Sequence, residues 1–246
     1  MKFFTAIRLA YRAFLRKDEY SRYILAEKVS ERIYPKFKYA EFGRLYLEDE
    51  AFLSQYRRLC GRDANWHSLD RKFALDQLVQ SVVYVDGDTA ECGAFEGASS
   101  WFICRRIAGL EKQHHIFDSF EGLSEPSEQD GAHWVGGDLA AQEGAARRNL
   151  QEFGFVHYHK GWIPERFSRV EDRRFCLVHI DVDLYQPTLD SLEFFYERMR
   201  PGGLIICDDY DFSTCPGAKK AMDEFFTGMP EKIVRLPTGQ AFITKR

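Results

Sequence analysis

The chain has 246 residues, of which 45% are hydrophobic and 29% charged, and its formal net charge is −4. This composition is typical of a folded domain and excludes a disordered, collagen-like or low-complexity chain. Because the charge gives no broad positive field, we expect a small-molecule partner and no nucleic acid. The length suits one elaborated domain with an appendage.

Cysteine usage and hydropathy indicate the compartment. The six cysteines show no Cys-x-x-Cys spacing, and three of them lie in apolar stretches typical of buried strands. Free thiols in a reducing compartment are therefore expected. No apolar run approaches the ~20 residues that cross a bilayer, and no secretory signal is recognisable at the N-terminus. These observations predict a cytoplasmic protein.

Residues 1–17 predict a basic amphipathic helix. They carry five basic residues and no acid, while Phe4, Ile7, Tyr11 and Phe14 recur at the spacing of one helix face. Such a helix packs on the domain or on a second subunit of a homo-oligomer, or it lies on an anionic membrane surface, here the inner face. Residues 18–80 continue with helical patterning and many aromatics. We therefore expect 1–80 to form a helical cap that closes over a substrate.

From residue 84, short apolar runs alternate with helical stretches, as in βαβ units. The predicted strands are 89–93, 115–120, 156–159, 175–183 and 204–208, and the predicted helical segments are 98–108, 139–153, 164–170, 188–199 and 217–226. Five such units call for a parallel sheet with helices on both faces. Residues 233–236 and 241–244, joined by a Pro-Thr-Gly turn, predict an antiparallel hairpin at one edge. The predicted fold of 81–246 is thus α/β, doubly wound and Rossmann-like, and it resembles the class I methyltransferase architecture.

Open α/β sheets bind ligands at the carboxyl ends of their strands. The first predicted strand contains Glu91 and ends at Gly93, and a turn through Gly97 leads to Ser99 at the start of a helix. Glycines let the backbone approach a ligand, and the amides of a helix N-terminus suit a carboxylate or a phosphate. An ordinary tight turn explains these glycines equally well.

The second and third strands add candidates for a nucleoside. Asp118 and Ser119 end the second strand, where an acid can accept hydrogen bonds from ribose hydroxyls. The alternatives for this acid are a helix N-cap and a surface position. Trp162 follows the third strand, where it borders an adenine ring or belongs to the core.

The fourth and fifth strands both end in carboxylates. Asp181 and Asp183 are spaced by one residue, which predicts that they share one side of the pleat, and Asp208 and Asp209 end the next strand. These acids would repel one another unless a cation lay between them. Oxygen ligands completed by water and substrate describe Mg²⁺, and no His or Cys cluster competes for zinc. The alternative is that the acids cap the following helices.

Together these motifs resemble the macrocin O-methyltransferase family, whose members include sugar O-methyltransferases of antibiotic biosynthesis. The resemblance covers roughly residues 85–246 and leaves the first 60 unexplained. It rests on the runs 91–93, 118–123, 181–188, 201–203 and 208–210. The metal-binding aspartates also resemble those of catechol O-methyltransferases, whose catalytic lysine stands three residues after the first aspartate, where this chain has Leu184.

The resemblance implies a set of roles. S-adenosylmethionine is the implied methyl donor, with Glu91, Gly93 and Gly97 around its methionine end and Asp118 on its ribose. Mg²⁺ is the implied metal, held by Asp181, Asp208 and Asp209. The expected acceptor is a sugar or polyol hydroxyl of a glycan or glycosylated metabolite.

Two points of chemistry remain open at this stage. Asp181 is the first candidate for the base and His179 the second, although His179 is expected in the core.

A nicotinamide-dependent dehydrogenase or epimerase would explain Asp118 but neither the paired carboxylates nor the hairpin. A non-catalytic scaffold with this fold is the third possibility, and the retained metal-ligand set argues against it.

Overall fold

The computed structural model describes residues 3–34, 42–60 and 69–246, which divide into two compact units, 1–55 and 56–246. In the smaller unit, α1 (Phe3–Ala10) continues as the π-helical segment η1 (Tyr11–Leu15), and α2 (Glu19–Ile33) and the short η2 (Leu45–Glu48) follow. α3 (Glu50–Cys60) contains the unit boundary. The predicted helical character of residues 1–60 is confirmed where they are described; 1–2, 35–41 and 61–68 lie outside the described residues. Among the described helices, none is both long and apolar enough to cross a membrane.

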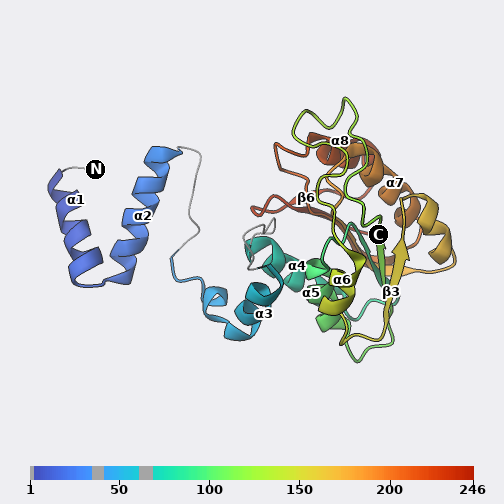
Figure 1. The fold of residues 1–246 in the computed structure, drawn as a ribbon, viewed down its shortest axis with the longest axis horizontal. Helices are drawn as coiled ribbons and strands as arrows, with labels where there is room; N and C mark the ends of the chain where they lie inside the picture. Colours follow the sequence, from blue (N-terminus) through green and yellow to red (C-terminus); the bar gives the residue numbers. More distant parts are fainter. Residues whose placement is uncertain (1–2, 35–41, 61–68) are drawn as a thin grey trace. The chain divides into compact units, whose positions relative to one another are not determined.

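The larger unit is built on a mixed seven-stranded sheet of order β3-β2-β1-β4-β5-β7-β6. Figure 1 labels β3 and β6, the strands at the two edges of this sheet. Its strands are β1 (Asp88–Cys92), β2 (His114–Asp118), β3 (Val156–Lys160), β4 (Phe175–Ile180), β5 (Met199–Cys207), β6 (Val234–Arg235) and β7 (Ala241–Thr244). The first five run parallel, and β7 pairs antiparallel with both β5 and β6, as predicted. The strand order reverses between β1 and β4, so a ligand crevice is expected at their carboxyl ends.

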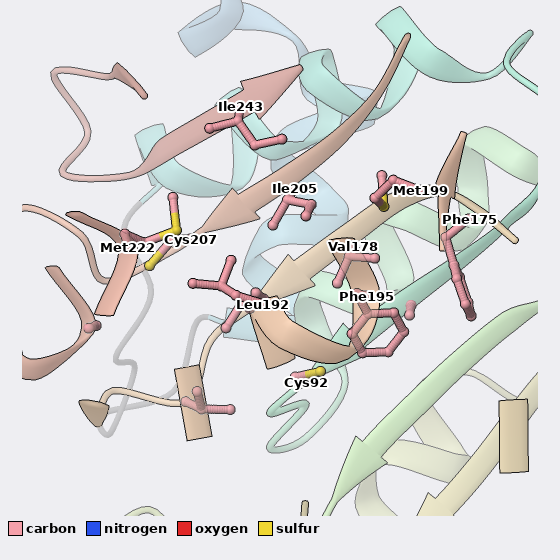
Figure 2. Packing of buried hydrophobic residues seen from close by; sticks show 14 of the residues in the cluster. Cys92, Phe175, Val178, Leu192, Phe195, Met199, Ile205, Cys207, Met222 and Ile243 are labelled. Carbon is pink, nitrogen blue, oxygen red and sulfur yellow. The ribbon is translucent and has the colours of Figure 1, made fainter. Parts of the chain in front are cut away.

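Helices cover both faces of this sheet. They are α4 (Leu69–Val82), α5 (Ala98–Ile107), α6 (Glu143–Asn149), the 3₁₀ turn η3 (Glu165–Val170), α7 (Tyr185–Tyr196) and α8 (Pro216–Phe225). Successive residues of β5 point to opposite faces: Ile205 packs with α7 and α8, whereas Ile206 packs with α4 and α5. Figure 2 shows the first of these layers, in which Leu192 and Phe195 of α7 lie against Val178 and Ile205. The six cysteines are unpaired, as predicted, and all six are buried, whereas the sequence indicated burial for three.

Three predicted boundaries are wrong for local reasons. The helix expected over 139–153 is reduced to α6, because Leu139 has φ 60°, which a helix excludes. The strand expected to reach 183 ends at Ile180. The strand predicted over 204–208 is longer, because β5 begins at Met199 and includes Pro201-Gly202-Gly203.

The position of α4 also differs from the expected layout. The sequence places the division between cap and catalytic domain at residue 80, whereas the boundary between the compact units falls between Gln55 and Tyr56. Leu75, Val79 and Val82 of α4 belong to the core beneath the sheet. α4 is therefore part of the larger unit, and its polar residues can contribute to the site.

Candidate active site

A cavity of about 600 Å³ opens at the carboxyl ends of the parallel strands, within the larger unit. Its volume is in the range of small-molecule sites. Five of the residues predicted for the site line it: Gly93, Asp118, Ser119, Trp162 and Asp181. The sequence therefore brings candidates from four different strand ends to one cavity.

Gly93 allows β1 and β4 to approach closely at the cavity wall. Its φ is +81°, and a Cβ added there would lie 1.8 Å from the backbone carbonyl oxygen of Asp181. The backbone N–H of Asp181 donates to the carbonyl of Cys92 over 2.8 Å, which ties the two strand ends together. Any side chain at residue 93 would therefore displace the backbone of Asp181.

Asp118 anchors the turn that follows β1. Its carboxylate accepts hydrogen bonds from the backbone N–H groups of Ala94, Phe95 and Phe120 at 2.7, 2.9 and 2.6 Å. Burial raises the pKa of Asp118, although these three donors act in the opposite direction. A carboxylate has about four acceptor positions, so capacity for a ribose hydroxyl remains. Ser119 lines the cavity, and its hydroxyl donates to the carbonyl of Gly122 over 3.0 Å.

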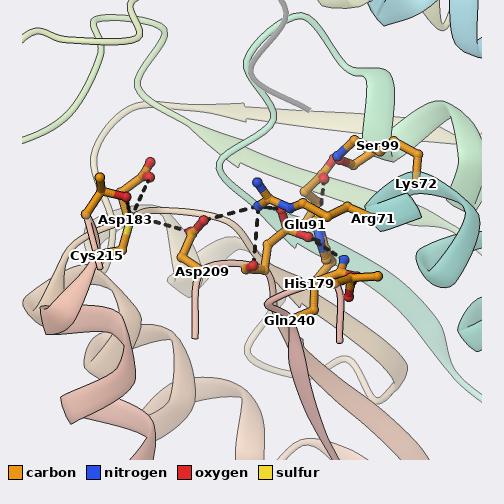
Figure 3. Close-up of polar contacts among 12 residues, drawn as sticks. Arg71, Lys72, Glu91, Ser99, His179, Asp183, Asp209, Cys215 and Gln240 are labelled. Atoms are coloured by element: carbon orange, nitrogen blue, oxygen red, sulfur yellow. Dashed lines mark hydrogen bonds and ion pairs between the residues drawn. The ribbon is translucent and has the colours of Figure 1, made fainter. Parts of the chain in front are cut away.

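Glu91, Gly97 and Ser99 are not among the described residues that line the cavity. Gly97, at φ +83°, begins α5, and a Cβ there would lie 3.1 Å from Leu150. The hydroxyl of Ser99 accepts a hydrogen bond from the fully buried Lys72 (Figure 3). Glu91 is also fully buried. These three positions support the cavity wall from behind.

The three predicted metal ligands do not gather in one group. Potential ligand atoms of Asp181 and Asp208 lie within 4.8 Å of one another together with His179, whereas Asp209 groups in the same way with Asp183 and Cys215. The guanidinium of Arg71 lies between the two groups, in ion pairs with Asp208 and, at 3.2 Å, with Asp209 (Figure 3). Arg71 thus supplies a positive charge where the sequence required one.

The backbone after β4 explains this division. Asp183 has φ 60°, its N–H donates to the Asp209 carboxylate over 3.1 Å, and its own carboxylate accepts from the Cys215 thiol over 3.3 Å. The prediction that Asp181 and Asp183 share one side of the pleat is therefore wrong, because the strand has already ended. Burial, and then the charge of Asp181, raises the pKa of Asp209 to about 6. Burial and the neighbouring carboxylates also raise the pKa of Asp183.

A line of hydrogen-bonded side chains, here the buried polar chain, runs inward from Asp208. The carboxylate of Asp208 lies 2.6 Å from the donating amide of Gln240 and 3.1 Å from His179 Nε2. His179 Nδ1 lies 2.8 Å from the carboxylate of Glu91, which also accepts from Ser100. The line ends at His114 and Thr89. His179 is fully buried, as predicted, between two carboxylates.

Arg71 and Lys72 are the site residues that sequence reasoning missed. Both lie on the buried face of α4 with Leu75 and Val79, at helical spacing. Burial lowers the pKa of Lys72, while the charge of Asp181 acts in the opposite direction. Two cationic residues on the apolar side of a helix were a detectable signal, because an unpaired buried charge is costly.

The donor set fits a hard divalent cation. Within the described part of the chain, the two candidate ligand groups contain four carboxylates (Asp181, Asp183, Asp208 and Asp209) beside His179 and Cys215, and the cations nearby are Arg71 and Lys72. Asp208 Oδ2 is buried and accepts no hydrogen bond from the described residues, although it is in ion-pair contact with Arg71. Carboxylate oxygens in excess over positive charge are the environment that Mg²⁺ prefers.

Comparison with known proteins places this geometry in a family. Residues 58–235 match the family model described as macrocin-O-methyltransferase (TylF). The chain belongs to the macrocin O-methyltransferase family. This methyltransferase is 32% identical over 184 residues to 8-demethyl-8-(2,3-dimethoxy-alpha-L-rhamnosyl)-tetracenomycin-C 4'-O-methyltransferase of Streptomyces olivaceus, covering 65% of this chain and 70% of that protein. It is 29% identical to demethyldecarbamoylnovobiocin O-methyltransferase of Streptomyces niveus, covering 67% and 70%.

Solved structures agree on the fold. The O-methyltransferase NovP superposes with a TM-score of 0.59 at 25% identity, covering 78% of this chain and 88% of that one. The calicheamicin methyltransferase CalS11 superposes with a TM-score of 0.65 at 17% identity, covering 85% and 99%. The methyltransferase is therefore an S-adenosylmethionine-dependent enzyme with the predicted class I fold, and the nicotinamide-dependent alternative is wrong.

Proposed function

We propose that the enzyme methylates a sugar or polyol hydroxyl of a glycosylated metabolite or glycan, with Mg²⁺ in the site. One relative supports the acceptor class by name, the rhamnosyl-tetracenomycin enzyme, and mycinamicin III 3''-O-methyltransferase of Micromonospora griseorubida is a second O-methyltransferase among the relatives. The observation that carries the proposal is the cavity itself. Asp181, a carboxylate with access to a ligand, shares that cavity with the Gly93 turn and Asp118.

We infer the position of S-adenosylmethionine from the cavity-lining groups that can still accept a contact. The backbone at Gly93 admits the methionine end, and the remaining acceptor capacity of Asp118 suits the ribose hydroxyls. Trp162 lines the cavity and is 41% exposed, so its ring face is available to an adenine. Gly97 belongs to the turn that follows β1, and Ser119 belongs to the turn that follows β2. The nucleoside would lie between these two turns. Glu91 and Ser99 act from behind the wall.

Asp181, Asp208 and Asp209 would hold the cation. When bound, it would lower the pKa of an acceptor hydroxyl, as metals do for water. Arg71 already contacts two of these carboxylates, so it shares their charge with the metal. Both contacts are made by the same guanidinium nitrogen, Nη2, so a single positively charged group holds the two carboxylates.

The reaction requires a base and alignment. We assign the base to the Asp181 carboxylate, which takes the acceptor's hydroxyl proton as the oxygen attacks the methyl carbon. A carbon–oxygen bond forms, the carbon–sulfur bond breaks, and its electron pair returns to sulfur, which leaves S-adenosylhomocysteine and a methyl ether. His179 is less suitable because it is fully buried between Glu91 and Asp208. Holding nucleophile, methyl carbon and sulfur in line supplies much of the rate.

The test is methyl transfer from S-adenosylmethionine carrying a labelled methyl group. Acceptors should include rhamnosides, nucleotide-linked deoxysugars, glycosylated aglycones and a catechol, with product masses read in each case. We expect labelled product with a glycosylated acceptor, loss of turnover in EDTA, and recovery with Mg²⁺. Exclusive labelling of the catechol would refute the acceptor class, and full turnover in EDTA would refute the metal. Absence of turnover with every acceptor, combined with absence of S-adenosylhomocysteine binding, would favour the scaffold alternative.

A further inference from the structure

The helical hairpin made of α1, η1 and α2 exposes large apolar side chains in its first half. Ile7 is 52% exposed, Tyr11 49%, Phe14 68% and Leu15 74%. A scattered exposed apolar residue needs no explanation, but a contiguous group of this kind marks an interaction surface. These four residues follow one another along α1 and η1 and end at the turn into α2.

The turn that presents Phe14 and Leu15 is tightly built. The backbone N–H of Asp18 donates to the carbonyl of Arg12 over 3.0 Å, and its carboxylate caps α2 by accepting from the N–H of Ser21 over 3.1 Å. The Arg22 side chain donates to the carbonyl of Ala13 over 2.9 Å. Phe14 and Leu15 are therefore held outward by the hairpin's own hydrogen bonds.

Positive charge accompanies the apolar group. Arg8, Arg12, Arg16 and Lys17 are exposed, and residues 3–17 contain no acid. The nearest acid, Asp18, is engaged by Ser21 and, at 3.2 Å, by Arg12. α2 differs, since its three basic residues are matched by three acids. The cationic surface is therefore confined to the part of the hairpin that exposes Phe14 and Leu15.

We propose that this surface, the hairpin tip (Ile7, Arg8, Tyr11, Phe14, Leu15, Arg16 and Lys17), binds an anionic membrane surface. Apolar side chains beside cations are the combination that enters the lipid interface while contacting acidic headgroups. A second copy of the tip would bring like charges together, which opposes self-association through this face. The charge of the tip therefore favours the membrane over self-association through this face.

The experiment is flotation of the full-length chain with vesicles of phosphatidylcholine alone or of phosphatidylcholine with phosphatidylglycerol. Binding should require the anionic lipid and weaken in high salt. The double variant Phe14→Ser/Leu15→Ser should lose roughly 10-fold or more of the bound fraction. Arg8→Gln/Arg16→Gln/Lys17→Gln should weaken binding and remove its salt dependence, without touching the Arg12–Asp18 ion pair.

The matched control is Val29→Ser/Ile33→Ser, which removes two exposed apolar residues from the charge-balanced α2 and should float like the wild type. Circular dichroism establishes that each variant is folded, and light scattering gives its mass in solution. Failure of the wild type to float with anionic vesicles would overturn the proposal. Equal loss in the control variant would do the same, because it would show general stickiness. A fall from dimer to monomer in the Phe14→Ser/Leu15→Ser variant, without any vesicle binding by the wild type, would assign the tip to a second copy.

Discussion

The acids that line the cavity differ from the acids of the buried polar chain behind it. Asp181 and Asp118 have access to a ligand, whereas Glu91 and Asp208 are fully buried and are bonded to His179, Ser100 and Gln240. All four belong to motifs that resemble the family pattern. The difference indicates that these motifs contain two kinds of residue, those that line the cavity and those that are buried behind it, and the proposed metal ligand Asp208 belongs to the buried kind.

The largest expected effect is that of Asp181→Asn. It removes the proposed base while keeping the side chain's size, so kcat should fall roughly 10²–10⁴-fold. Calorimetry should find the affinity for S-adenosylhomocysteine unchanged. Asp190→Asn is the control, because Asp190 also lines the cavity but is bonded to Gln186 on α7. An equal loss of activity in both variants would contradict the assignment of Asp181 as the base, because any cavity-lining acid would then have the same effect.

Arg71→Ala tests the residue that joins the two groups of acids. Removing one partner of a buried ion pair typically costs about 3–5 kcal/mol, so the free energy of unfolding in EDTA should fall by an amount of that order. Mg²⁺ should restore part of the loss, and Arg71→Lys should be intermediate because it keeps the charge but not the fork. Chemical denaturation with and without metal gives these values. An Arg71→Ala variant as stable as the wild type in EDTA would show that the acids need no resident cation.

His179→Gln tests the buried polar chain. It leaves a buried carboxylate short of a donor, so the free energy of unfolding should fall by about 1–3 kcal/mol. The folded variant should keep far more methyl transfer than Asp181→Asn. A loss of kcat as large as that of Asp181→Asn, at unchanged stability, would identify His179 as the base and remove the distinction between the two groups.

A further effect concerns the pH dependence of stability, through His114 at the inner end of the buried polar chain and through His159 outside it. Burial lowers the pKa of His114 to about 3, and that of His159, on the neighbouring β3, to about 4, from 6.5. Because the unfolded chain takes up these protons first, their stabilisation is present above about pH 6.5 and is lost as the pH falls toward 4. Urea denaturation across this range should show the decline, and His159→Gln should flatten it. An unchanged slope in the variant would exclude His159 as a contributor.

The sheet was predictable from sequence because apolar runs and βαβ spacing are local signals, and strand ends followed from them. Gly93, Asp118 and Asp181 could therefore be placed at one edge. Arg71 could not, because it reaches the aspartates only through the packing of α4 across more than a hundred residues of chain. Asp181 and Asp183 belong to different groups because Asp183 has a positive φ, and no residue pattern predicts a positive φ at an aspartate.

The antiparallel strand β7 is synthesised after all the residues that line the cavity. Gln240, which directly precedes β7, donates to Asp208, and β7 pairs with the strand that carries that aspartate. A nascent chain grows from its N-terminus, so every residue that lines the cavity leaves the ribosome before Gln240 does. The cavity wall is thus complete in sequence while Asp208 still lacks its amide partner. A chain halted before Gln240 would contain every cavity-lining residue but would lack both the amide donor to Asp208 and the strand that pairs with β5.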